Sequence, residues 1–140
     1  MAATENVITQ RQEDMRIGVP VSGGIKIFGG SMVFIGADGF ATNVETAGTT
    51  PFAGIADNEV DNIAGADGDK FIDVVDGIWS HLDGSSFTQA DVGVDLFATD
   101  DNTLTATSTS NTFVGRVVEF RSATRVAWRS AGLASGVIGP

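Results

Sequence analysis

Hydrophobic and polar positions alternate over short stretches along most of this chain. Apolar runs at 25–28, 32–35 and 52–56 are separated by glycines and polar residues. A period of two over so few residues is typical of β-strands rather than helices. The pair Asp38-Gly39, which follows the second run, is a strong signal for a hairpin turn. The pattern therefore predicts short strands joined by tight turns.

The stretch KFIDVVDGIW at 70–79 is apolar on both faces of the strand that it predicts. Alternation places Ile72, Val74 and Ile78 with Asp76 on one face, and Phe71, Val75 and Trp79 with Asp73 on the other. A sheet with one solvated face alternates more cleanly than this. We therefore expect one face to lie in the core and the other to meet a second sheet or another subunit. The candidate residues of an oligomer interface are Phe71, Val75 and Trp79.

The second half of the chain predicts a polar turn and two hairpins. Thr88 and Asp91 are expected to bond backbone amides in the turn. A hairpin follows, with Leu96-Phe97 and Leu104–Ala106 as its strands and Asp101-Asn102 at its tip. Two final strands flank Ser122-Ala123. On the last of them alternation places Val126 and Trp128 on one face and Arg125 and Arg129 on the other.

A weak internal repeat connects the two halves. The order Val33-Phe34, Asp38-Gly39, Phe52-Ala53-Gly54 recurs as Leu96-Phe97, Asp101-Asn102, Phe113-Val114-Gly115. A β-hairpin unit used twice explains this order, and so does chance similarity between glycine-rich hairpins. The sequence leaves both explanations open.

The N-terminal residues show little periodicity. Residues 1–16 are compatible with an extended arm, a short helix capped by Thr4, or a frayed tail. The tail SAGLASGVIGP at 130–140 is compatible with a closing strand or a flexible end. The predicted organisation is an arm at 1–18 followed by a single β domain at 19–140.

Composition agrees with a small β protein. The chain has 140 residues, of which 18 are glycine and 42% are hydrophobic, too many for a disordered chain. The predicted fold class is all-β: a compact β-barrel or β-sandwich of short strands with an extended N-terminal arm. The absence of cysteine excludes thiolate metal sites, thiol nucleophiles and disulfides. The N-terminus has no secretory h-region, and no apolar run reaches the ~20 residues of a membrane span, so we expect synthesis in the cytoplasm and no membrane partner.

Charge is strongly acidic and unevenly distributed. The formal net charge is -10, which argues against nucleic acid as a partner. Twelve of the 18 acids lie at 57–101, where Lys70 is the single lysine or arginine. Four arginines follow position 102 against one acid, Glu119. This asymmetry would favour docking of copies, acidic surface to basic surface.

No motif for catalysis or cofactor binding is found in the sequence. The acidic stretch DNEVDNIAGADGDKF at 57–71 fails as an EF-hand, since Asn62 and Gly68 occupy the positions of the required glycine and glutamate. We therefore interpret it as a solvated turn. Asp73 and Asp76 are expected on opposite faces of their strand, and His81 with Asp83 lacks a nucleophile elbow. No catalytic residue, cofactor or metal is expected.

Arg121, Arg125 and Arg129 form the one basic cluster. A charged edge that prevents aggregation is the favoured interpretation. Docking on an acidic partner surface ranks next, ahead of nucleic-acid binding, because alternation turns Trp128 away from its neighbouring arginines.

The order of several segments resembles that of a known family. These segments are FAGIA, VDNIAGADGD, GIW, TQADVG and DDNTLTATSTSNTFVG, at Phe52–Ala56, Val60–Asp69, Gly77–Trp79, Thr88–Gly93 and Asp100–Gly115. In this order and spacing the chain resembles the capsid decoration, or cement, proteins of tailed bacteriophages. The resemblance covers about residues 20 to 129, most of the chain.

The resemblance implies a structural protein without catalytic activity. Such a protein binds the outer surface of an expanded phage capsid in the virion and stabilises it by bridging major capsid proteins. It assembles with itself, as a homotrimer or a dimer. The family supplies no motif for docking, so the chemistry of this sequence suggests the candidate capsid-docking residues: Val7, Ile8, Arg11, Met15, Arg16, Arg121, Arg125 and Arg129.

Two other functions stay open at this point. One is a host- or glycan-binding adhesion module displayed on a particle, with Trp79 and Trp128 as its candidate aromatics. The other is a hydrolase that uses the carboxylates of Asp73 and Asp76.

Overall fold

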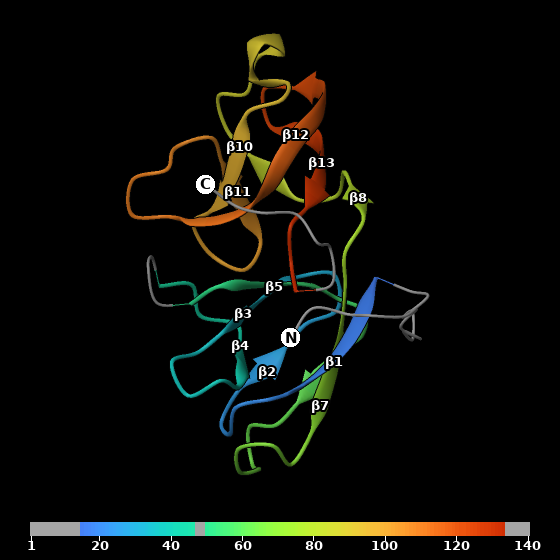
Figure 1. Ribbon diagram of the computed structural model, residues 1–140, viewed down its shortest axis with the longest axis vertical. Coiled ribbons are helices and arrows are strands. Elements are labelled where there is room, and N and C mark those ends of the chain that lie inside the picture. Colours follow the sequence, from blue (N-terminus) through green and yellow to red (C-terminus); the bar gives the residue numbers. More distant parts are fainter. Residues whose placement is uncertain (1–14, 47–49, 134–140) are drawn as a thin grey trace, which may run out of the picture.

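The computed structural model describes residues 15–46 and 50–133, and their fold is all-β. A five-stranded antiparallel sheet, the first sheet, forms one half of the molecule (Figure 1). Its strands, in spatial order, are β1 (Arg16–Pro20), β7 (Phe71–Val75), β5 (Phe52–Ala56), β3 (Met32–Ile35) and β4 (Ala41–Thr42). A two-stranded ribbon of β2 (Lys26–Ile27) and β6 (Val60–Asp61) lies in the same half.

A six-stranded sheet, the second sheet, forms the other half. Its strands, in spatial order, are β8 (Ile78–Trp79), β13 (Arg125–Ser130), β12 (Thr112–Ser122), β10 (Asp95–Ala98), β11 (Thr103–Thr105) and β9 (Asp83–Gly84). The 3-10 turn η1 (Gln89–Asp91) is held by a capping box, in which the Thr88 amide donates to Asp91 Oδ2. The predicted polar turn is thus confirmed.

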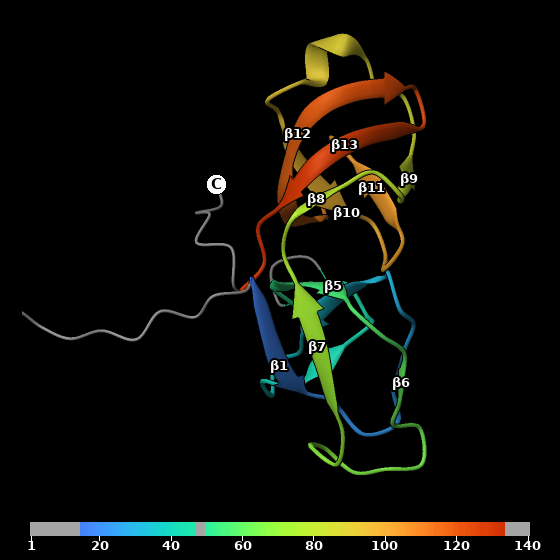
Figure 2. The same cartoon turned by 90° about the vertical axis from the view of Figure 1, so that its right-hand side faces the viewer.

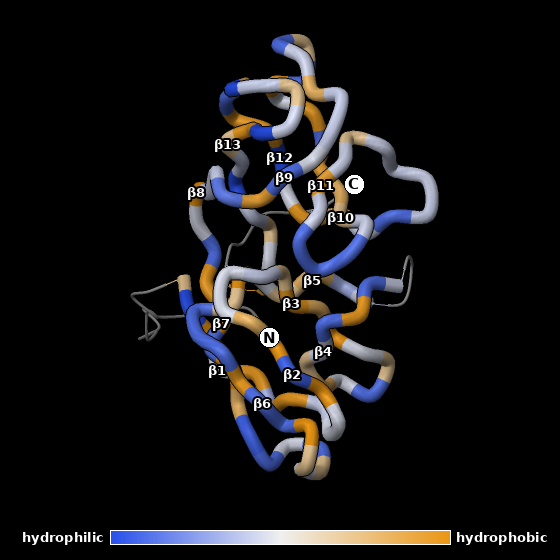
Figure 3. The backbone as a smooth tube through the Cα atoms, turned by 180° about the vertical axis from the view of Figure 1, so that it is seen from behind, coloured by the Kyte–Doolittle hydropathy of each residue, from blue (hydrophilic) through white to orange (hydrophobic). Residues whose placement is uncertain are grey.

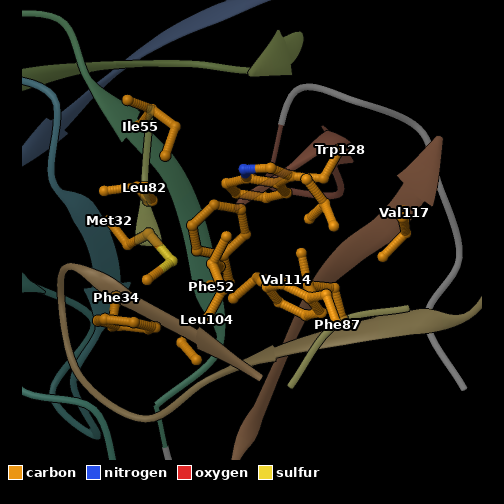
Figure 4. Close-up of a cluster of buried hydrophobic side chains, with 13 residues drawn as sticks. Met32, Phe34, Phe52, Ile55, Leu82, Phe87, Leu104, Val114, Val117 and Trp128 are labelled. Carbon is orange, nitrogen blue, oxygen red and sulfur yellow. The ribbon is translucent and has the colours of Figure 1, made fainter. Parts of the chain in front are cut away.

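The two halves lie end to end and share a core. Figure 2 shows β7 running toward the second half, where the chain continues into β8. A cluster of buried side chains joins Met32, Phe34, Phe52 and Ile55 of the first sheet to Leu96, Val117 and Trp128 of the second, among others (Figure 4). The sheets are not closed into a barrel, so of the two expected architectures the sandwich-like one is confirmed.

The two sheets repeat one strand arrangement. In the first sheet β3 pairs with β4 and β5, and in the second β10 pairs in the same way with β11 and β12. Phe34 faces Thr42 and Phe52, while Phe97 faces Thr105 and Phe113. Each central strand is bulged immediately before this phenylalanine, between Val33 and Phe34 and between Leu96 and Phe97.

The correspondence includes the outer strands. The row Ile17, Val74, Ala56 across β1, β7 and β5 matches the row Trp79, Trp128, Val117 across β8, β13 and β12. The parallel bridge between Val21 and Ala41 also has its counterpart, between Gly84 and Leu104. Of the two explanations for the weak sequence repeat, the structure supports a strand unit used twice.

The halves differ in what covers each face. Met32 and Ile55 of the first sheet are buried against the second half. By register their counterparts are Asp95 and Arg116, which lie outward and form an ion pair at 2.9 Å. At the other end, the β2–β6 ribbon contributes Ile27 and Val60 to a second buried cluster inside the first half. The second half therefore ends in a charged, solvated surface, and the first half ends in the β2–β6 ribbon. Terminal units of repeat proteins need such caps because no further unit covers them.

The predicted single strand at 70–79 is wrong in the structure. β7 ends at Val75, and the chain crosses at Asp76-Gly77 to the second sheet, where Ile78 and Trp79 form β8. The crossing reverses the expected faces, because Ile78 is 63% exposed and Trp79 packs against the core. The cause is not local, since Asp76 is buried and its Oδ1 accepts hydrogen bonds from Ser130 Oγ and the Gly132 amide.

Candidate functional surfaces

The predicted oligomer-interface residues are not brought onto one face. Phe71 is 62% exposed and shares the outer side of β7 with the half-buried Val75. Trp79 lies in the other sheet, half-buried, and its Nε1–H donates to Ser130 Oγ at 3.1 Å. Only Phe71 and Val75 therefore remain available together as a surface. The exposed Ile78 was missed, because the break after Val75 depends on contacts distant in sequence.

The acidic stretch at 57–71 is a set of turns held by its own carboxylates. Asp61 Oδ1 accepts from the Ile63 amide at 3.0 Å, Asp69 Oδ2 from the Ala66 amide at 2.9 Å, and Asp67 Oδ1 from the Gly23 amide at 2.8 Å. In the part of the chain that the structure describes, no group of three acids or histidines is arranged to hold a metal ion. The carboxylates are used as acceptors for backbone N–H groups.

Asn62 is the buried centre of these turns. Its side-chain nitrogen lies within hydrogen-bond distance of the carbonyl oxygens of Val21, Ser22 and Ala66. Its Oδ1 is buried against Gly65, where a β-carbon would collide with it. The stretch thus needs an asparagine and a glycine for packing, and this is a structural role that an EF-hand comparison does not detect.

The two carboxylates considered for a hydrolase do not form a pair. Asp73 is exposed on β7 and lies 3.8 Å from Arg16, whereas Asp76 is buried at the junction of the two halves. The expected opposite faces of one strand do not describe the pair, because β7 ends at Val75 and Asp76 lies beyond it at the crossing.

His81 lies beside the junction of the halves. Its Nε2 is 2.7 Å from the Gly30 carbonyl oxygen, and its ring meets Trp79 edge to face at 5.9 Å. These contacts fix the ring between two halves of the chain and are sufficient to explain its presence.

Most of the candidate docking arginines already carry a counter-ion. Arg125 pairs with Asp83, Arg121 lies 3.7 Å from Glu119, and Arg16 pairs with Asp57 at 2.6 Å. Arg129 is exposed on β13 beside Trp128, which is fully buried as predicted. Met15 is half-buried, and its carbonyl oxygen accepts from the Asp76 amide, while Val7, Ile8 and Arg11 lie outside the described residues. Residues 16–18, assigned from sequence to the arm, form the start of β1.

A notch of about 460 Å³ opens where the halves meet. It is lined by Phe28, Gly29, Gly30, Ser31, His81, Leu82, Asp101 and Asn102. Partial burial raises the pKa of the Asp101 carboxyl above its ordinary value, and the neighbouring charge of Asp100 raises it further. Phe28 is 55% exposed at this notch, with Lys26 Nζ 5.1 Å from its ring centroid. Sequence reasoning missed the notch, because its residues come from three separate segments, 28–31, 81–82 and 101–102.

The adhesion alternative relied on two tryptophans as exposed aromatics. Trp128 is fully buried, and Trp79 is half-buried where it lines a small pocket of about 310 Å³ with Val75 and His81, so neither is a fully exposed aromatic. Phe28 is the aromatic side chain that stands at the notch.

Comparison with protein-family models, curated proteins and solved structures finds no match to this chain. Among the residues that the structure describes, no helix has the length and hydrophobicity needed to span a membrane.

Proposed function

We propose that this chain is a structural virion protein that binds the outer surface of an expanded phage capsid and bridges its major capsid proteins. The observation that carries the proposal is the repeated strand arrangement. One chain holds two related halves, each ending in an outermost strand, β1 in the first sheet and β8 in the second. A chain with two related halves is suited to contact two copies of one partner in a regular lattice.

The packed and hydrogen-bonded junction between the halves supports a bridging role. The shared cluster of buried side chains and the Asp76–Ser130 hydrogen bonds join the two sheets across the middle of the molecule. A rigid bridge transmits load between the partners that it joins, whereas a flexible linker does not. Because the second contact becomes intramolecular once the first has formed, two modest contacts give a large joint affinity.

Binding to the expanded lattice alone would stabilise that lattice by mass action. The effect grows with the ratio of free protein to its dissociation constant and is multiplied over many sites. It requires no bond-making step, which fits a chain whose carboxylates serve as turn acceptors and ion-pair partners. The ordered segments that resemble phage decoration proteins point to the same function.

The proposed docking surface combines the arm with the outer side of the second sheet. From the arm we retain Val7, Ile8, Arg11, Met15 and Arg16, and from the β12–β13 hairpin Arg121 and Arg125. The proposed partners are the phage major capsid protein and further copies of this chain, in an assembly on the outer capsid surface after synthesis in the host cytoplasm. The net charge of -10 supports a partner other than nucleic acid.

The test compares expanded and unexpanded capsids of the phage that encodes the protein. Purified full-length chain is mixed with each form, and cosedimentation and the melting temperature of the capsid are measured. We expect binding to expanded capsids and a higher melting temperature for them, with little binding to the unexpanded form. A chain that ignores both forms, or that binds without raising the melting temperature, would refute the proposal.

A further inference from the structure

One arginine on the described surface has no acidic partner. Arg16, Arg116, Arg121 and Arg125 are each within 4.0 Å of a carboxylate, whereas Arg129 makes no ion pair and no side-chain hydrogen bond within residues 15–46 and 50–133. Arg129 lies on the outer face of the second sheet, on the strand next to its β8 edge, opposite Arg116 on one side and Ile78 on the other.

The surroundings of Arg129 are partly apolar. Ile78 is 63% exposed and Val118, on the neighbouring strand β12, is 43% exposed. Arg116 is turned to Asp95, which offsets its charge. Arg129 therefore combines a free guanidinium with exposed aliphatic surface, a combination that is typical of protein interfaces.

One carboxylate within the described residues is unpaired as well. Every other acidic side chain there accepts a hydrogen bond from another residue or forms an ion pair, whereas Asp101 does neither. Asp101 lines the notch, at the tip between β10 and β11, where its carbonyl oxygen accepts from the Met32 amide of the first half. Figure 3 shows this hydrophilic tip reaching the first half beside β3.

The notch has the size and chemistry to accept an arginine side chain. Its volume of about 460 Å³ exceeds that of one side chain, and Phe28 and Leu82 supply apolar contact for an aliphatic stem. The Asp101 carboxylate is an acceptor of charge-assisted hydrogen bonds from a guanidinium. Its charge is only partly solvated, so an arriving cation would also relieve the cost of that partial burial.

We propose that copies of this chain associate with each other by placing Arg129 and Ile78 of one copy in the Asp101 notch of another. The contact joins two different surfaces, so it closes either when two copies exchange it or when several copies form a ring. The proposal deepens the self-association included in the proposed function and replaces Phe71, Val75 and Trp79 as its contact residues. It also assigns Arg129 to self-contact rather than to capsid docking.

The test measures the molar mass of the full chain in solution, without capsids. Light scattering after size exclusion is applied to the wild type, Asp101→Arg, Arg129→Asp and the double variant Asp101→Arg/Arg129→Asp. We expect an oligomer for the wild type, at least about tenfold weaker association for each single variant, and recovery in the double variant because the opposite charges are restored. Raising the salt concentration should weaken the wild-type oligomer.

Two controls keep the result interpretable. Arg121→Asp makes the same charge change on the neighbouring strand and should leave the molar mass unchanged. Thermal unfolding by circular dichroism checks that each variant folds, as expected because Asp101 and Arg129 make no side-chain bond to another described residue and Arg121 makes only an exposed ion pair. A wild type that stays monomeric, or single variants that keep the wild-type oligomer, would overturn the inference. Capsid binding is measured separately, so loss of the proposed function does not affect this outcome.

Discussion

The hydroxyl of Ser130 is the centre of the junction between the two halves, which makes its removal an informative perturbation. Ser130 is fully buried, and its Oγ donates to Asp76 Oδ1 at 2.7 Å. The same oxygen accepts the Gly77 amide at 2.9 Å and Trp79 Nε1–H at 3.1 Å. The substitution Ser130→Ala therefore removes three hydrogen bonds at the point where the chain passes from the first sheet to the second.

The expected loss follows from the groups that are left behind. A buried donor without a partner costs about 1–3 kcal/mol, and a bond to a charged group contributes about 1.5–3 kcal/mol. The Gly77 and Trp79 donors are only partly buried, so we take the lower end of the range of about 1–3 kcal/mol for each of them. Asp76 keeps its hydrogen bond from the Gly132 amide at 2.7 Å. The sum is about 3.5–5 kcal/mol, a large fraction of the roughly 5–15 kcal/mol that stabilises a typical domain.

Equilibrium unfolding in urea at pH 7 measures this loss. Trp79 and Trp128 are the only tryptophans in the chain, and both contribute to the shared core, so their fluorescence reports its integrity. The free energy of unfolding is extrapolated to water for the wild type and the variant. The two values are compared if the slope of the free energy against urea concentration is the same for both. Ser122→Ala is the matched control, because Ser122 is exposed and its hydroxyl bonds, within the described residues, only to Thr124. We expect a change within about 0.5 kcal/mol. A loss below about 1 kcal/mol for Ser130→Ala would show that the hydrogen-bonded junction is not what holds the halves together.

Three further predictions concern the acidic turns and the notch. Gly65→Ala should destabilise the protein by about 2–4 kcal/mol in urea unfolding, because the new β-carbon collides with the buried Asn62 Oδ1. The control Ala64→Ser, at the exposed neighbouring position, should change the free energy of unfolding little. Equal losses for the two variants would contradict the packing role of Gly65. Partial burial raises the pKa of the Asp101 carboxyl above its ordinary value of 3.8, so the folded state binds the carboxyl proton more tightly than the unfolded state does. The free energy of unfolding therefore falls as the pH rises from 3.8 through the pKa of the folded state. In the Arg129→Asp background, Asp101→Asn should therefore raise the melting temperature at pH 7 and lose this advantage near pH 3, and an equal effect at both pH values would refute it. Calcium or a chelator should shift the melting temperature by less than about 1 °C, since Asp61, Asp67 and Asp69 accept from backbone amides while Asp57 and Glu59 form ion pairs. A calcium-dependent increase would show that the turns bind the ion.

Local pattern was sufficient to predict most of the strands. The runs at 32–35 and 52–56 coincide with β3 and β5, and the hairpin around Asp101-Asn102 coincides with β10 and β11. Alternation along β13 also placed Trp128 in the core and Arg125 and Arg129 on the surface. These features depend on neighbours within a few residues, because the direction of a side chain on a strand is determined by its position in the alternation.

The repeat was only weakly visible because the two halves face different surroundings. Met32 and Ile55 are apolar where the second half covers them, while their counterparts Asp95 and Arg116 are charged where the described chain leaves them exposed. Burial at one set of positions and solvation at the other favour chemically different residues at equivalent places. The relationship between the two halves is therefore visible in the pairing register of their strands rather than in the identity of their residues.

By itself the sequence determined an all-β chain of short strands, the turns between them, and a set of carboxylates without a catalytic or metal-binding motif. The tertiary structure decided where β7 ends, since hydrogen bonds from the distant Ser130 and Gly132 stabilise the buried Asp76 carboxylate at that point. It also decided which charges are paired and which are free, and it brought Phe28, His81 and Asp101 to one notch. The physical reason is that strand formation depends on the local alternation of side chains. The burial of a carboxylate or the pairing of a charge depends on residues that are distant in the chain and meet only after folding.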